Sequence, residues 1–141
     1  TMFLALNASV ELYKGGVVPL AEYAQRPYDR DILVRVIVPK ENARFVYQSV
    51  RNSQTDFPVL TCAAAKLADG SIRAVIGARP GKAVLYTAAP EAGETAEEFA
   101  ARFAAEVKAD IKTESNLRGG AEYRRHLAGV LTKRAVCRLE G

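Results

Sequence analysis

The sequence is poor in the residues that bind metals or form disulfides. It has one histidine, His126, and two cysteines, Cys62 and Cys137, far apart in the chain. There is no CxxC pair and no cluster of His, Cys and Asp at ligand spacing, which argues against a metal site. Both cysteines lie in apolar segments. We therefore expect two reduced, packed thiols of a cytoplasmic protein, with a disulfide as the weaker alternative.

Long hydrophobic runs are also missing. The longest apolar segments are interrupted by Lys66 or Arg73, well before the roughly 18 residues that a bilayer span requires. No charged segment followed by an apolar one opens the chain. The sequence therefore predicts no membrane contact and no targeting signal.

Glycine-rich phosphate loops are absent as well. The two glycine pairs, Gly15-Gly16 and Gly119-Gly120, are too short and lie outside a strand, GxGxxG loop and helix. The residues by themselves therefore indicate no nucleotide site.

What remains is the composition of a soluble globular domain. The 141 residues are 49% hydrophobic and 26% charged, with a net charge of +4, which is close to the average for globular proteins. A chain of this length can bury a core without disulfides or metals. Much of the positive charge lies near the C-terminus, where a basic run is usually a solvated helix face. Nucleic-acid binding would need exposed aromatic residues or a recognisable motif, and Tyr123 alone does not supply one, so no nucleic-acid partner is expected.

The first forty residues are predicted to be mostly extended. Apolar and polar residues alternate from Leu4 to Leu12, which is typical of a strand. A turn at residues 14–16 and a short strand at residues 17–20 follow, and residues 21–30 form a loop with room for one helical turn. Residues 31–39 contain the clearest strand, rich in β-branched residues and ended by Pro39, and we expect it to be well buried.

The middle of the chain predicts a hairpin. Residues 59–67 and 71–76 are apolar, and Asp69-Gly70 between them suits a two-residue turn. A strand at residues 44–50 precedes the hairpin, and residues 84–86 could add a last short strand. A helix from Phe57 to Ala68 is the alternative, because three consecutive alanines have good helix propensity.

Two amphipathic helices are predicted to close the chain. Thr95 and Glu98 have the spacing of a capping box, and Phe99, Phe103 and Val107 follow on one face. The second helix begins after Gly119-Gly120. Its apolar face comprises Tyr123, Leu127, Val130, Leu131 and Ala135, with Arg124, Arg125, Lys133 and Arg138 largely off that face. The fold class is therefore α+β, with a small antiparallel sheet of about three strands packed by C-terminal helices.

No catalytic constellation emerges from these residues. His126 lies on a basic helix, and the spacing identifies neither a nucleophile nor an acid to work with it, so we expect a surface residue. Asp56 is a lone acid between a polar loop and an apolar strand. A turn or cap residue is the simpler interpretation there, and a catalytic acid is the alternative.

Five segments, taken in order, resemble the flavoprotein (medium) subunit of molybdenum hydroxylases of the xanthine dehydrogenase and carbon monoxide dehydrogenase type. LALNASVEL resembles the family's "LALgA.v.l", GGVVPLAEY its "R.vpl.eF", and DILVRVIVP its "EiI..i.iP". FVYQSVRNSQTDFPVLTCAAA is similar to "f.k..rR.s.D.a.v..A", and GGAEYRRHLAGVLTKRAV is similar to the closing "as.eYRr.l..vl..ra". Each match is weakly specific, but five in the right order are a stronger signal.

The resemblance implies two parts of a larger subunit. Residues 1–43 would be the end of a FAD-binding domain, and residues 44–141 a C-terminal α+β domain with a three-stranded antiparallel sheet. In the family, FAD takes electrons from iron–sulfur clusters on one partner subunit, after a molybdenum cofactor on another has oxidised the substrate, and passes them to an acceptor such as NAD. The glycine loops that hold the FAD phosphates lie upstream of "LALgA".

The resemblance also implies two flavin-side residues. An apolar residue of the "EiI" strand approaches the flavin ring, and it corresponds to Leu33. A lysine of the "f.k..r" segment in some members corresponds to Gln48, which can hydrogen-bond the ring but brings no positive charge. For Leu33 a purely structural, buried strand position is the alternative. For the whole chain, the alternative is a cofactor-free assembly domain that docks onto the partner subunits.

Overall fold

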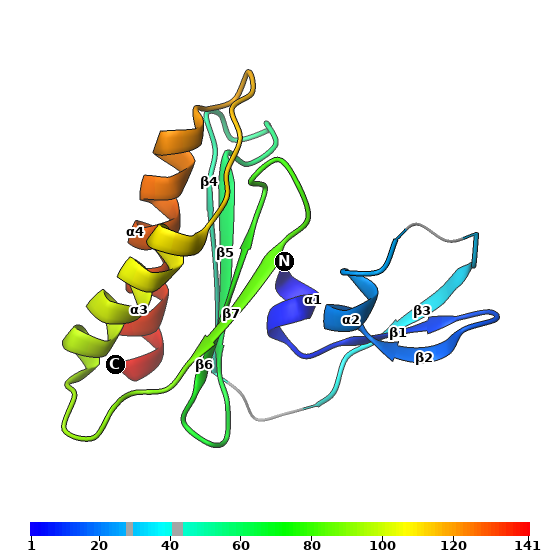
Figure 1. Ribbon diagram of the computed structural model, residues 1–141, viewed down its shortest axis with the longest axis horizontal. Coiled ribbons are helices and arrows are strands. Elements are labelled where there is room, and N and C mark those ends of the chain that lie inside the picture. Colours follow the sequence, from blue (N-terminus) through cyan, green and yellow to red (C-terminus); the bar gives the residue numbers. More distant parts are fainter. Residues whose placement is uncertain (28–29, 41–43) are drawn as a thin grey trace.

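The computed structural model describes residues 1–27, 30–40 and 44–141, which form two antiparallel sheets and four helices (Figure 1). The elements in chain order are α1 (Met2–Ala5), β1 (Ser9–Leu12), β2 (Gly16–Pro19), α2 (Leu20–Tyr23), β3 (Leu33–Ile37), β4 (Arg44–Val50), β5 (Leu60–Lys66), β6 (Ile72–Gly77), β7 (Val84–Ala88), α3 (Ala96–Asp110) and α4 (Ala121–Glu140). No helix within these described ranges has both the length and the hydrophobicity that a membrane span needs.

The larger sheet has the strand order β4-β5-β6-β7, with every neighbouring pair antiparallel. The predicted α+β class is confirmed, with four strands instead of about three because β7 completes the sheet. The hairpin of β5 and β6 is also confirmed, and the alternative helix over residues 57–68 is wrong. Its loop has three residues, 68–70, because the N–H of Leu67 donates to the carbonyl of Ser71. Gly70 takes the positive φ (84°) that such a loop requires.

Helices α3 and α4 cover one face of this sheet (Figure 1). The capping box is confirmed, since Thr95 Oγ1 accepts from the N–H of Glu98 and the Glu98 carboxylate accepts from the N–H of Thr95. Phe99 and Phe103 stack with ring centroids 5.9 Å apart. Together with Val107 they pack onto the apolar side chains of β5 and β6 to form the main core.

One expectation for α4 is wrong. Arg124 was predicted to lie off the apolar face, yet it is 1% exposed, whereas Tyr123 is 49% exposed. The buried guanidinium donates hydrogen bonds to three backbone carbonyls and to a side-chain amide oxygen: Val59 O, Glu114 O, Gly119 O and Asn116 Oδ1. Buried charges are tolerated when they are fully hydrogen-bonded, so Arg124 organises the start of β5 and the loop before α4.

The other face of the larger sheet is partly covered by α1 (Figure 1). The strand predicted from Leu4 to Leu12 is confirmed only from Ser9 onward, because residues 2–5 form a helical turn. Leu4 and Ala5 of α1 pack against Ala63 and Val75 of the sheet. This packing is long-range, so the local alternation of apolar residues could not reveal it.

The smaller sheet has the order β2-β1-β3. The apolar side chains of β1 and β2 pack against Leu20 and Tyr23 of α2. The expectation that the strand in residues 31–39 is well buried is wrong, because all five residues of β3 are exposed. Strand β3 pairs only with β1, which makes it an edge strand. The predicted domain boundary after residue 43 adjoins residues 41–43, which lie outside the described part of the chain, so that boundary stays a prediction.

Candidate functional site

Leu33 begins the exposed edge strand β3. It pairs with Leu12 of β1 next to a register shift in the ladder, and its side chain is 45% exposed. The side chains of Ile32 and Val34 beside it are also exposed. Leu33 therefore lies within an accessible apolar surface, and the alternative of a buried strand residue is wrong.

Gln48 lies in the other sheet, on the face of β4 that is turned toward α4. Its Nε2 donates to the carbonyl oxygen of Leu131 in α4 at 3.3 Å, and Val46 and Val50 on the same face pack against the core. No hydrogen bond or packing cluster among the described residues joins Gln48 to Leu33. The structure therefore does not bring the two predicted flavin-side residues together.

Tyr47 is an accessible aromatic residue of β4 that the sequence did not single out. It is 43% exposed and lies on the opposite face from Gln48, because successive strand residues alternate. Phe45, on that same face, packs against the cluster that Leu4 and Ala5 of α1 form with Ala63 and Val75. The alternation of the segment was visible in the sequence, but only the cover of α4 on one face shows which side of β4 remains accessible.

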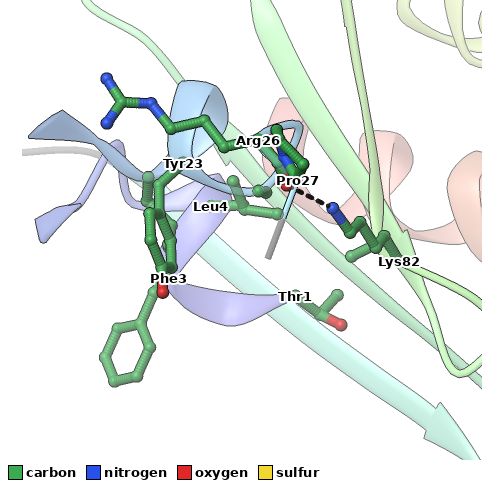
Figure 2. Close-up of a pocket in the computed structure, with 10 residues that line it drawn as sticks. Thr1, Phe3, Leu4, Tyr23, Arg26, Pro27 and Lys82 are labelled. Carbon is green, nitrogen blue, oxygen red and sulfur yellow. Dashed lines mark hydrogen bonds between the residues drawn. The ribbon is translucent and has the colours of Figure 1, made fainter. Parts of the chain in front are cut away.

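A cavity of about 440 Å³ lies at the junction of the two sheets (Figure 2). Its walls come from α1, from α2 and the segment after it, and from the loop between β6 and β7; the lining residues are Thr1, Phe3, Leu4, Leu20, Tyr23, Ala24, Arg26, Pro27, Lys82 and Ala83. Most of these side chains are apolar. Lys82 Nζ donates to the carbonyl oxygen of Arg26 at 3.0 Å, and this bond connects the two sides of the cavity.

Asp56 has the bonds of a structural residue. Its carboxylate accepts from Arg118 Nε at 3.0 Å and from the N–H of Phe57 at 2.7 Å. The Arg118 guanidinium and then the Phe57 N–H hold the pKa of Asp56 below its usual value. A carboxylate that stays ionised in this way is a poor proton donor, which favours the predicted turn residue over the catalytic acid.

His126 is exposed on α4, as predicted. It lines a shallow groove between α3 and α4 together with Lys108 and Lys133. No residue of catalytic type other than these bases lines that groove. The structure therefore adds nothing to a catalytic interpretation of His126.

Both cysteines are free. Cys62 is buried in β5, and burial raises the pKa of its thiol to about 12, so it is inert at neutral pH. Cys137 was expected to be packed, and this is wrong, because it lies on the exposed side of α4. No group of His, Cys, Asp and Glu in the described ranges could hold a metal ion.

Solved structures with a similar fold include a quinoline oxidoreductase and carbon monoxide dehydrogenases. Quinoline 2-oxidoreductase from Pseudomonas putida 86 aligns with a TM-score of 0.75 and 18% identity, over 98% of this chain and 54% of that chain. Carbon monoxide dehydrogenase from Hydrogenophaga pseudoflava, in a form that lacks the Mo-pyranopterin moiety of its cofactor, aligns with a TM-score of 0.77 and 22% identity, over 97% and 54%. Reconstituted CO dehydrogenase from Oligotropha carboxidovorans aligns with a TM-score of 0.75 and 20% identity, over 99% of this chain and 55% of that chain.

The chain thus spans about half the length of the solved chains that it matches. No curated protein sequence matches it. Residues 45–139, well over half of the chain, match the family model of the CO dehydrogenase flavoprotein C-terminal domain. The resemblance found in the sequence is therefore confirmed, and the chain belongs to the family of CO dehydrogenase flavoprotein C-terminal domains.

Proposed function

We propose that this chain is the C-terminal part of the FAD-binding subunit of a cytoplasmic molybdenum-dependent oxidoreductase. In this role it takes part in passing electrons from iron–sulfur clusters through FAD to an acceptor such as NAD. The iron–sulfur clusters and the molybdenum cofactor belong to partner subunits. The observation that carries the proposal is the family match over residues 45–139.

The described residues fit the flavin ring of FAD but not its pyrophosphate. Leu33 offers an exposed apolar side chain of the kind that packs against a flavin ring. At the first glycine pair the N–H groups of Lys14 and Gly15 already donate to the Asp31 carboxylate, and at the second pair Gly119 donates to Asn116. Neither pair is therefore free to cradle phosphates, and we assign the pyrophosphate to a part of the subunit outside this chain.

Two positions of β4 are candidates for the second contact with the ring. Gln48 can hydrogen-bond a flavin only if its amide leaves the carbonyl of Leu131. Tyr47 is already accessible on the opposite face. We keep Gln48 as the proposed residue and make Tyr47 its competitor in the experiment.

The test uses the longest natural protein that contains this chain, purified and examined for the visible absorbance of bound flavin. We expect a yellow protein, and we expect Leu33→Asp to reduce flavin content because a carboxylate would face an apolar ring. Val17→Asp, at an exposed position of β2, is the matched control and should leave flavin bound. A colourless natural protein would contradict the proposal.

The same preparation separates Gln48 from Tyr47. If Gln48 contacts the ring, Gln48→Ala shifts the flavin spectrum and potential, whereas Tyr47→Ala does not. The reverse result would assign the contact to Tyr47.

A second candidate function is a cofactor-free assembly domain. The observation that favours it is the run of exposed apolar residues along β3, since large apolar patches usually mark interaction sites; they are Ile32, Leu33, Val34, Val36, Ile37 and Val38. This alternative predicts that the chain joins a complex with the partner subunits when flavin has been removed. Complex formation that requires flavin would count against it.

A further inference from the structure

The junction cavity has the size and lining of a small-molecule site. Its volume of about 440 Å³ falls within the roughly 300–1,000 Å³ that is usual for ligand pockets. Such pockets are mostly apolar and contain a few convergent polar groups. Here the apolar wall includes Phe3, Leu4, Leu20, Ala24, Pro27 and Ala83, and the polar groups include the side chains of Tyr23 and Lys82.

Lys82 brings a positive charge that no anion balances among the described residues. Its ammonium donates to one neutral carbonyl, that of Arg26, and an ammonium has three donors. The guanidinium of Arg26 is paired with Glu22 at 2.6 Å and points away from Lys82 in Figure 2. Among the described lining residues, Lys82 is therefore a cationic side chain that has donors left for an incoming anion.

The loop that carries Lys82 is held in an uncommon backbone conformation. Ala78 has φ of 58° and Gly81 has φ of 141°. Arg79 fixes this loop, because its Nε donates to the carbonyl of Lys82 at 2.8 Å and its Nη1 donates to the carbonyl of Lys112. A positive φ at a non-glycine residue is uncommon and persists only where the surroundings enforce it. The hydrogen bonds of Arg79 thus hold the backbone of Lys82 in place beside the cavity.

We propose that the junction cavity binds a small ring compound that carries one negative charge. The ring would lie against Leu4, Leu20 and Pro27, and its carboxylate, sulfonate or phosphate would take the place of the Arg26 carbonyl at the ammonium of Lys82. This ligand site does not depend on flavin binding by the intact subunit.

The test is a fluorescence titration of the longest natural protein that contains this chain with anilinonaphthalene sulfonate, which has apolar rings and one anionic group. We expect a single site and a loss of about tenfold or more in affinity for Lys82→Met, because one charge-assisted contact is lost. Lys112→Met is the matched control, because this lysine is exposed and lies outside the cavity lining. The affinity of this variant for the dye should change by less than about twofold. Benzoate should displace the dye, and benzyl alcohol, which has the ring without the charge, should not.

A second variant keeps the proposal testable if Lys82→Met disturbs the fold. Ala24→Trp fills the cavity from the residue just after α2. It should abolish dye binding while circular dichroism shows an unchanged fold. The proposal is overturned if Lys82→Met binds like the wild type, if Ala24→Trp leaves binding intact, or if benzyl alcohol competes as well as benzoate. If flavin mononucleotide displaces the dye and remains bound, the cavity belongs to the flavin site; that result would overturn a separate ligand while supporting the proposed function.

Discussion

The two sheets of this protein are built from similar residues but are buried very differently. In the larger sheet, β6 contains Ile76, which is fully buried, whereas in the smaller sheet β3 contains Ile37, which is 37% exposed. Both strands are rich in β-branched residues, which favour extended structure wherever they occur. The difference teaches that residue type predicts the strand, and that the elements packed above and below it decide how much the strand contributes to stability.

The larger sheet has cover on both faces. Helices α3 and α4 lie on one face and α1 on part of the other (Figure 1). In the smaller sheet, α2 packs against β1 and β2, and β3 remains at an exposed edge. Substitutions in the larger sheet and its helices should therefore lower the free energy of unfolding much more than matched substitutions in the smaller sheet.

The largest effect is expected at Arg124. Arg124→Met should lower the free energy of unfolding by about 4 kcal/mol, because the buried bond to Val59 O and the partly buried bonds to Glu114 O and Gly119 O are lost. A hydrogen bond from a charged group contributes about 1.5–3 kcal/mol. Urea unfolding measures this. Arg125→Met, one residue further along α4 and exposed, should change stability by less than about 0.5 kcal/mol. Equal effects of the two substitutions would show that the buried hydrogen bonds contribute no net stability.

A matched pair of isoleucines tests the comparison directly. Ile76→Ala should cost about 3 kcal/mol, through lost burial and the cavity that remains. Ile37→Ala should cost about 1 kcal/mol or less, because much of that side chain is already in water. The urea unfolding midpoints of the two variants give the answer. A cost at Ile37 that matched the cost at Ile76 would mean that β3 is covered in solution.

The sequence predicted well the features that local chemistry decides. The hairpin follows from Asp69-Gly70 between two apolar runs, and the start of α3 follows from the spacing of Thr95 and Glu98; both are present. The family resemblance also came from local segments. These features depend on residues within a few positions of one another, so they can be inferred without knowing the fold.

The errors share a long-range cause. The helical turn α1 packs on β5 and β6, some sixty residues away in sequence. Arg124 is buried because its guanidinium donates to the carbonyl of Val59, far away in sequence, and to the carbonyls of Glu114 and Gly119 in the loop before α4. Strand β3 is exposed because no further described element packs on it. The junction cavity could not be predicted either, since Lys82 reaches Arg26 across 56 residues. For Leu33, only the fold shows that the side chain is exposed, and its flavin-side role stays a prediction.

A smaller effect is expected at the N-cap of α3. Thr95→Ala should lower stability by about 1 kcal/mol, because the N–H of Glu98 loses its acceptor and the reciprocal capping box is broken. Thr87→Ala, at an exposed position of β7, is the control, and its side chain caps no helix. Thermal unfolding followed by circular dichroism distinguishes the two variants. If both lowered the melting temperature equally, the cap would add nothing to the helical cover of the larger sheet.

The smallest effects are expected in the pH dependence of stability, which can show whether the two sheets unfold together. Arg102 of α3 holds the pKa of Glu94, in the loop just before α3, at about 2, well below its ordinary 4.5. Partial burial opposes ionisation of Asp31 in the smaller unit, but the N–H groups of Lys14, Ile32 and Gly15 lower its pKa below 3.8 overall. A lowered pKa stabilises the folded state above the ordinary pKa, and this stability is lost as the pH falls through the folded value.

Glu94→Gln and Asp31→Asn should therefore each flatten the decrease in stability between pH 7 and pH 3. Glu97→Gln, on the exposed first turn of α3, is the control that should keep the wild-type slope. Urea unfolding followed by helical circular dichroism reports the larger sheet with its helices, and hydrogen exchange of residues 9–19 reports the smaller sheet. If the two sheets form one cooperative unit, each substitution changes the slope of both signals. If each substitution changes only the signal of its own unit, the sheets unfold separately, and the weakly covered β3 unit is held to the rest of the chain by little more than α1 and the contacts around the junction cavity.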